Sequence, residues 1–156
     1  MAAKEKSSAW SLFLTLHAVL IEAVERRLSM VGLPALEWYD ALWALERAPQ
    51  RRLRMHEFEQ WMVISRSNIT RLVDRLEKAG LVRRERADED RRGAFAVLTA
   101  EGLAMRRRMW VIYEAAIEDL FHAHLTGAEL REAEAVFRKL LSPHTASAPN
   151  SRPSTH

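Results

Sequence analysis

Apolar residues recur at three- and four-residue steps along most of this chain, the spacing that places them on one face of an α-helix. Such stripes run through residues 10–28, 36–46, 65–79, 103–121 and 130–141, and a shorter helical segment spans 55–62. Gly32 and Pro34 separate the first two stripes, and Pro34 suits the first turn of the second helix. The pattern predicts a mainly α-helical protein.

Two segments after Gly80 have the composition of strands instead. Residues 81–86 (LVRRER) and 94–99 (AFAVLT) read as strands, and the charged loop ADEDRRG joins them. Glycine at position 80 can end the preceding helix in the left-handed conformation, so that the chain turns sharply. The short link VIS between the helices 55–62 and 65–79 indicates a helix-turn-helix. A helix-turn-helix followed by a β-hairpin is a winged helix.

Polar residues at the expected helix starts support these boundaries. Ser65 is a candidate N-cap for the helix 65–79, and Thr99 is one for the long helix after the hairpin, with Glu101 in its first turn. Thr126 and Glu129 have the spacing of a capping box. The stripe expected to pack inward from the helix 65–79 consists of Ile69, Leu72, Val73 and Leu76. Its opposite side carries Ser, Asn, Thr and Arg, which are groups suited to recognition.

On this pattern the chain divides into four parts. They are an N-terminal helix (1–34), a winged helix-turn-helix core (35–99, with its recognition helix at about 65–79 and its wing at about 81–99), C-terminal helices (100–142) and a polar tail (143–156). The tail is broken by prolines, which predicts disorder. The apolar stripes of the outer helices exceed what a small core can cover, which predicts a two-fold homodimer formed by 1–34 and 100–142. Packing within one chain is the alternative.

Positive charge gathers in the middle of the sequence. Residues 47–92 hold 13 Lys and Arg against 8 Asp and Glu, whereas the whole chain has a net charge of only +3. A concentrated basic zone is typical of nucleic-acid binding, although a solvated surface of mixed charge has the same composition. Charge alone leaves both interpretations open.

The composition and motifs of the chain argue against several classes of protein. The chain has no cysteine, which excludes disulfides, thiolate metal sites and cysteine nucleophiles, and which fits a cytoplasmic protein. The apolar N-terminal segment contains His17, Glu22 and Glu25, which argue against a signal peptide, and no uninterrupted apolar run approaches the ~20 residues of a membrane span. The histidines lack metal-site spacing, and no phosphate loop or nucleophile elbow occurs. We therefore expect no enzyme, no metal or cofactor, and no membrane association.

The segment SNITRLVDRLEKAGLVRRERADEDRRGAFAVLTAEG closely resembles the winged-helix core of MarR-type bacterial transcriptional regulators. The helices on either side resemble their dimerisation region, so the resemblance spans roughly residues 8–142. It implies a sequence-specific DNA-binding regulator, a ligand-responsive repressor that binds a palindromic operator as a homodimer. Two positions depart from the pattern: Glu59 stands where a small residue is usual, and Val63 stands where a turn glycine is usual. A β-branched residue disfavours positive φ, which predicts a different turn conformation at Val63.

The same resemblance implies which residues contact DNA. In the recognition helix they are Ser65, Ser67, Asn68, Thr70, Arg71 and Arg75, which would meet base edges and phosphates in the major groove. Arg91 and Arg92 would enter or flank the minor groove from the wing, and Asp88 and Asp90 would orient these arginines and shape the loop. A simple solvated turn is the alternative for the two aspartates.

Two further questions stay open at this point. The resemblance implies a small aromatic or phenolic effector, for which the candidate residues are Trp10, His17, Trp38, Trp43, Arg106 and Trp110. Tryptophans at helical spacing are as typical of a core as of a pocket. The alternative function is a winged-helix protein-interaction module, in which the basic face binds an acidic partner without selecting a DNA sequence.

Overall fold

The computed structural model describes residues 2–63, 68–86 and 93–145. The helices are α1 (Ala2–Met30), α2 (Leu36–Arg47), α3 (Phe58–Trp61), α4 (Ile69–Lys78), α5 (Ala100–Leu120) and α6 (Gly127–Thr145), with short 3-10 helices η1 (Pro49–Arg51), η2 (Met55–Glu57) and η3 (His122–His124). The strands are β1 (Arg52–Arg54), β2 (Val82–Arg86) and β3 (Ala94–Leu98). The predicted mainly α fold with a winged helix is confirmed.

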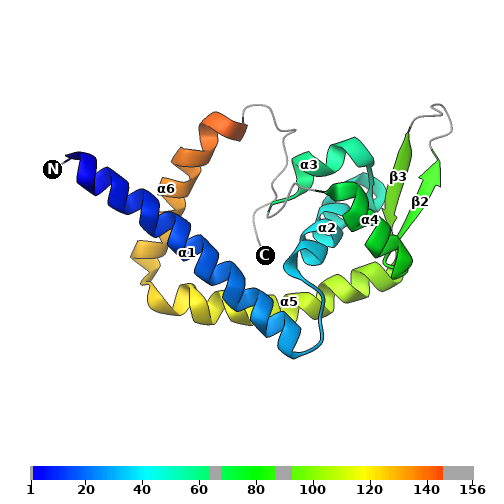
Figure 1. Ribbon diagram of the computed structural model, residues 1–156, viewed down its shortest axis with the longest axis horizontal. Coiled ribbons are helices and arrows are strands. Elements are labelled where there is room, and N and C mark those ends of the chain that lie inside the picture. The colour runs from blue at the N-terminus through cyan, green and yellow to red at the C-terminus, as the bar shows by residue number, and fades with distance from the viewer. Residues whose placement is uncertain (1, 64–67, 87–92, 146–156) are drawn as a thin grey trace.

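The molecule has a compact end and an extended end, joined by the long helix α5. Figure 1 shows α2, α3, α4 and the strands gathered at one end of α5, while α6 and the N-terminal half of α1 lie toward the other. The buried core of the compact end includes the predicted stripe of α4: Ile69, Leu72, Val73 and Leu76. A second buried cluster joins α1, α2 and α5 through Val24, Leu28, Leu36, Tyr39, Met109 and Ala116.

The sheet has one strand more than the sequence predicted. Its order is β1-β3-β2 and both pairings are antiparallel, with Leu53 opposite Ala96 and Arg84 opposite the same residue from the other side. The missed strand β1 has the sequence Arg-Leu-Arg, so that only Leu53 is buried. A segment of three residues with one apolar side chain is too short to show the two-residue alternation of a strand. The strand β1 forms because the edge of β3 provides hydrogen-bonding partners for it.

Three boundaries differ from the expected ones. Helix α4 begins at Ile69 rather than at 65, because Asn68 has a left-handed backbone (φ 60°), and Ser65 lies outside the described residues. Pro34 precedes α2 instead of lying in its first turn, and the amide of Leu36 donates to Glu25 of α1 (2.9 Å). Helix α6 continues through Pro143 to Thr145, so the predicted tail begins later than 143.

Pro143 is tolerated in α6 because a side chain replaces its missing donor. Proline has no N–H to give to the carbonyl four residues earlier, which here belongs to Lys139. The hydroxyl of Ser142 donates to that oxygen at 3.1 Å. The freed carbonyl is therefore satisfied, and the helix does not end there.

Two predicted N-caps are confirmed. The hydroxyl of Thr99 accepts from the amide of Gly102 at the start of α5 (3.0 Å). At the start of α6, the amide of Thr126 donates to the carboxylate of Glu129 (2.7 Å) and the amide of Glu129 donates to the hydroxyl of Thr126 (3.3 Å).

The start of α5 is packed directly against the end of α4. Gly80 has the predicted positive φ (75°), and its carbonyl accepts from the hydroxyl of Thr99 (2.8 Å). The carbonyl of the next residue, Leu81, accepts from the amide of Thr99 (3.2 Å). A Cβ on Gly102 would lie 2.1 Å from that same oxygen of Leu81 and 2.8 Å from Cδ1 of Leu98. Only glycine fits at position 102.

The N-terminal half of α1 is apolar and uncovered. By length and composition alone the segment Ser8–Met30 is long and apolar enough to cross a membrane: an 18-residue window within it has a mean hydropathy of 1.3 and is 6% buried. The expectation of no membrane association stays a prediction. The C-terminal half of α1, however, packs Val24 and Leu28 into the protein core.

We expect Gly102→Ala to lower the free energy of unfolding by about 1–3 kcal/mol, because the methyl group must displace a backbone carbonyl. Gly127→Ala is the matched control: a Cβ there meets only a guanidinium nitrogen of Arg131 at 3.5 Å, so stability should change by less than about 1 kcal/mol. Urea unfolding followed by circular dichroism measures both. Equal stabilities for the two variants would contradict the close packing at position 102.

Candidate nucleic-acid interface

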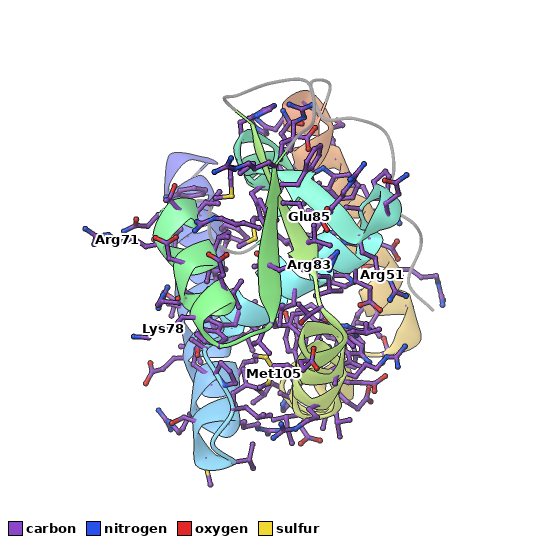
Figure 2. All side chains as sticks on the ribbon, turned by 90° about the vertical axis from the view of Figure 1, so that its right-hand side faces the viewer. Arg51, Arg71, Lys78, Arg83, Glu85 and Met105 are labelled. Carbon is purple, nitrogen blue, oxygen red and sulfur yellow. The ribbon has the colours of Figure 1, made fainter. Side chains whose placement is uncertain are left out.

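Helix α4 has one buried side and one exposed polar side. The exposed residues are Asn68, Thr70, Arg71, Asp74, Arg75 and Lys78. In Figure 2, Arg71 and Lys78 project from α4 toward the same side, away from the sheet. Asn68, Arg71, Asp74 and Arg75 line a hollow of about 510 Å³. The helix therefore presents hydrogen-bonding and cationic groups together at its N-terminal half.

The cations of this face differ in how they are used. Within the part of the chain that the structure describes, Arg71 and Lys78 form no ion pair. Arg75 instead binds Glu37 of α2, with 2.6 Å between its Nη2 and the carboxylate Oε1. Arg71 and Lys78 are consequently available to a phosphate, whereas Arg75 must first leave Glu37.

The structure brings some of the predicted contact residues together and does not describe the rest. Asn68, Thr70, Arg71 and Arg75 share the exposed side of α4. The other predicted residues, Ser65, Ser67, Asp88, Asp90, Arg91 and Arg92, lie outside the described ranges.

The base of the wing carries two arginines that the sequence analysis did not single out. Arg83 and Arg84 are neighbours on β2, so their side chains leave opposite faces of the sheet. Arg83 pairs with Glu85 on its own strand (2.5 Å), whereas Arg84 pairs with Asp74 (2.5 Å) and Glu77 (2.8 Å) of α4. The run VRRER signals basic character, but it does not show which arginine faces α4.

The end of the segment that follows α3 is tied to the core by a buried carboxylate. Asp40 of α2 is 1% exposed, and its two oxygens accept from the amide of Val63 at 2.8 and 3.1 Å. Val63 is not among the described residues with positive φ, as its β-branched side chain predicted. Asp40 thus satisfies the backbone donor of Val63, the position where a turn glycine was expected.

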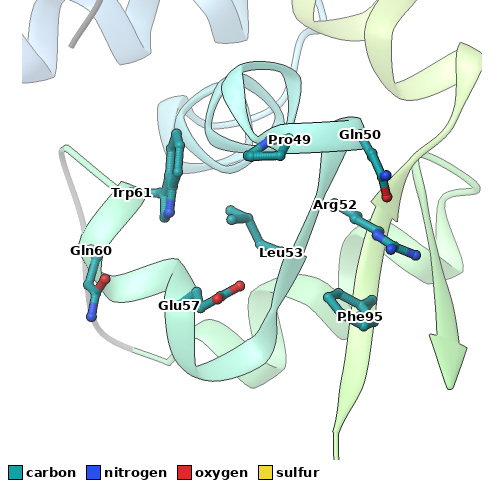
Figure 3. A pocket seen from close by; sticks show the side chains of 8 residues that line it. All are labelled: Pro49, Gln50, Arg52, Leu53, Glu57, Gln60, Trp61 and Phe95. Atoms are coloured by element: carbon teal, nitrogen blue, oxygen red, sulfur yellow. The ribbon is translucent and has the colours of Figure 1, made fainter. Parts of the chain in front are cut away.

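A second hollow, of about 450 Å³, lies beside the sheet. Figure 3 shows its lining: Pro49, Gln50, Arg52, Leu53, Glu57, Gln60, Trp61 and Phe95. Arg52 and Arg54 stack on the ring of Phe95, at 4.6 and 4.9 Å from its centroid, and Glu57 accepts from the amide of Arg54 (2.8 Å). These charged side chains are therefore engaged within the protein.

The residues predicted to bind an effector do not all lie together. Trp43 and Trp110 stack on Tyr39, with centroids 6.2 and 5.9 Å away, and Arg106 lies beside them, paired with Glu46 at 2.5 Å. Trp38 contacts both buried clusters, whereas Trp10 and His17 lie on the exposed half of α1. The group around Tyr39 is brought together by the fold, and the α1 residues are not part of it.

Burial governs the chemistry of that aromatic junction. It raises the pKa of Tyr39 to about 12, against the opposing effect of the Arg106 guanidinium. Burial and the nearby charge of Asp40 also raise the pKa of Tyr113. Both hydroxyls therefore stay protonated near neutral pH and can donate hydrogen bonds.

No group of three or more His, Asp or Glu side chains within the described ranges is placed to hold a metal ion.

Comparisons with known proteins agree on one family. The model of the MarR family matches residues 31–93. The chain is 30% identical to Sco3205 of Streptomyces coelicolor, a MarR family transcriptional regulator solved in complex with DNA; the match covers 92% of this chain and 90% of that one, with a TM-score of 0.82.

Two Escherichia coli relatives match over a shorter length. The HTH-type transcriptional regulator PapX is 35% identical over 104 residues, which are 67% of this chain and 63% of PapX. The transcriptional repressor MprA is 33% identical over 102 residues, which are 65% of this chain and 57% of MprA. Their names are those of regulators, as expected for a chain predicted not to be an enzyme. The winged helix, the identity across nine-tenths of Sco3205 and the match to the family model together show that this chain belongs to the MarR family of transcriptional regulators.

Proposed function

We propose that this protein is a homodimeric, sequence-specific DNA-binding regulator, and that α4 enters the major groove. The observation that carries the proposal is the exposed side of α4, where Asn68, Thr70 and Arg71 lie together. The amide of Asn68 and the guanidinium of Arg71 have the forked hydrogen-bonding geometry that distinguishes base pairs, and Thr70 can contact bases or phosphates. Sco3205, similar along nearly its whole length, was solved in complex with DNA.

The remaining DNA contacts belong to the same proposal. Ser65 and Ser67 precede Asn68 at the N-terminal end of the recognition segment, the end that meets base edges in helix-turn-helix proteins. Arg91 and Arg92 occupy the loop between β2 and β3, from which they would reach the minor groove. Asp88 and Asp90 would orient them.

The dimer covers the apolar half of α1 and the apolar side of α6. Trp10, Leu12 and Phe13 are 63%, 66% and 47% exposed, and Leu140 of α6 is 62% exposed. An exposed apolar surface of this length is typical of an interface, because leaving it in water forgoes about 25 cal/mol for each Å². A two-fold dimer places two α4 helices on successive turns of a palindromic operator. The parts 1–34 and 100–142 would supply the interface.

An effector would act at the aromatic junction between the two parts of the molecule. Trp43, Arg106 and Trp110 lie where α2 of the compact end meets α5. A small aromatic or phenolic acid that separated these rings would alter the angle between α2 and α5, and with it the spacing of the two α4 helices. We propose repression as the output, as the name of MprA states for that relative.

Mutations should distinguish contacts that select the DNA sequence from contacts that only add affinity. Asn68→Ala or Arg71→Ala should cost roughly 1–3 kcal/mol on the cognate site and much less on random DNA, because base contacts are lost. Arg91→Ala should weaken binding to both DNAs and lower the salt slope by about one unit. Titrations of each variant on both DNAs across a salt series, with DNA upstream of the protein's own gene as the candidate site, make the measurement. A wild-type protein without preference over random DNA would favour the protein-interaction module instead.

Dimerisation should depend on the apolar side of α1. Phe13→Glu should yield monomers at micromolar concentration and lose specific DNA binding with the dimer, because a charge would be buried against the partner helix. Arg26→Glu introduces the same charge into the polar C-terminal half of the same helix, where the Arg26 side chain is 70% exposed and pairs with Glu22, and it should leave the dimer intact. Light scattering measures the mass of each variant, and a dimeric Phe13→Glu protein would rule out this interface.

Effector binding should be reciprocal with DNA binding. An aromatic acid that packs against Trp43 or Trp110 should quench tryptophan fluorescence and weaken DNA affinity, because linkage makes the coupling mutual. Fluorescence titration with benzoate and other aromatic acids, with and without DNA, tests this. Quenching without any change in DNA affinity would show that ligand binding at the aromatic junction does not regulate DNA binding.

A further inference from the structure

One acidic residue lies between the two unpaired cations of α4. Arg71, Asp74 and Lys78 are spaced three and four residues apart, so their side chains follow each other along one side of the helix. Asp74 is 53% exposed and lines the same hollow as Arg71. An aspartate at this spacing can pair with either cation, and a paired cation is lost to DNA.

Arg84 of β2 binds this carboxylate from the other side. Its Nη2 lies 2.5 Å from Oδ1 of Asp74, and its Nη1 lies 2.8 Å from Oε2 of Glu77. One guanidinium thus pairs with both acidic residues of α4. Because Arg84 comes from the wing strand, the pair also draws Asp74 toward the sheet, whereas Arg71 and Lys78 project away from it (Figure 2).

We propose that Arg84 is a positioning residue for DNA binding: it keeps Asp74 from pairing with Arg71 and Lys78, and so leaves both cations free for phosphates and bases. This inference rests on the proposed function of α4. Arg84 need not touch DNA for this role. Without Arg84, Asp74 lies within one helical turn of Arg71 and of Lys78 and can pair with either, and its charge is left unneutralised.

The role is distinct from a contribution to folding. The side chain of Arg84 is 31% exposed and those of Asp74 and Glu77 are 53% and 39% exposed, and ion pairs in contact with water add little to stability. Arg83 provides the comparison. It is the adjacent residue of the same strand, also paired with a glutamate, but on the face of the sheet opposite to Arg84.

The test compares Arg84→Met with Arg83→Met in the full-length chain, since methionine retains much of the apolar stem and removes the charge. Binding to a mixed-sequence DNA duplex is measured across a salt series, and thermal unfolding is recorded for each variant. Arg84→Met should lower the affinity about tenfold at 0.1 M salt and reduce the salt slope by about one unit, because one cation is captured by Asp74. Arg83→Met should remain within about twofold of wild type.

The substitution Asp74→Asn tests whether the loss of affinity arises because Asp74 pairs with Arg71 or Lys78. In the Arg84→Met background it should restore the affinity and the slope, because the asparagine no longer captures Arg71 or Lys78. A loss that persists in the double variant would mean that Arg84 contacts DNA itself or shapes the fold, and would overturn the proposal. If Arg84→Met does not fold, Asp74→Asn is compared with the double variant; equal affinities are expected, and a tenfold difference would refute the proposal. A wild-type protein that binds no DNA would instead disprove the proposed function.

Discussion

The contact between the carbonyl of Leu81 and the first turn of α5 fixes the geometry of the whole compact end. Three elements meet there: Gly80 follows the end of α4, β2 begins at Val82, and α5 starts at the Thr99 cap. Because Gly102 has no Cβ, the helix approaches close enough for the amide of Thr99 to satisfy the Leu81 carbonyl. Neither α4 nor the wing can rotate relative to α5 without breaking these hydrogen bonds. The orientation of the proposed DNA-binding face is therefore tied to the helix that leads to α6.

Helix α2 provides the second connection between the extended end and α4. Its first amide, that of Leu36, donates to the carboxylate of Glu25 of α1. Its three acidic residues each bind a different part of the chain: Glu37 binds Arg75 of α4, Asp40 binds the amide of Val63, and Glu46 binds Arg106 of α5. Any change in the angle between α1 and α2 would reach α4 through these contacts. The aromatic rings around Tyr39 fill the same junction, which is why an effector is proposed there.

Fewer of the basic side chains in residues 47–92 are available to a binding partner than their number in the sequence indicates. Residues 47–92 contain 13 Lys and Arg. Several of them are occupied within the protein: Arg75 by Glu37, Arg83 by Glu85, Arg84 by two acidic residues of α4, and Arg47 by the ring of Trp43 at 3.8 Å. What remains on α4 is a small set of unpaired groups, and the pairing of their neighbours decides how free they are. Arrangement, more than net charge, makes this face suited to a polyanion.

The sequence alone determined the features that depend on neighbours within four residues: the buried stripe of α4, the glycine turn at position 80, and the caps at Thr99 and Thr126. Helical period and capping are local properties, so a linear pattern specifies them. Tertiary structure decided everything that needed a distant partner. The strand β1 exists only beside β3, the amide of Val63 finds its acceptor in Asp40 of α2, and Arg84 binds α4 because it leaves the face of the sheet opposite to Arg83. The sequence VRRER does not distinguish Arg83 from Arg84. The acidic residues that bind Arg84 belong to α4, and only folding brings them close to it.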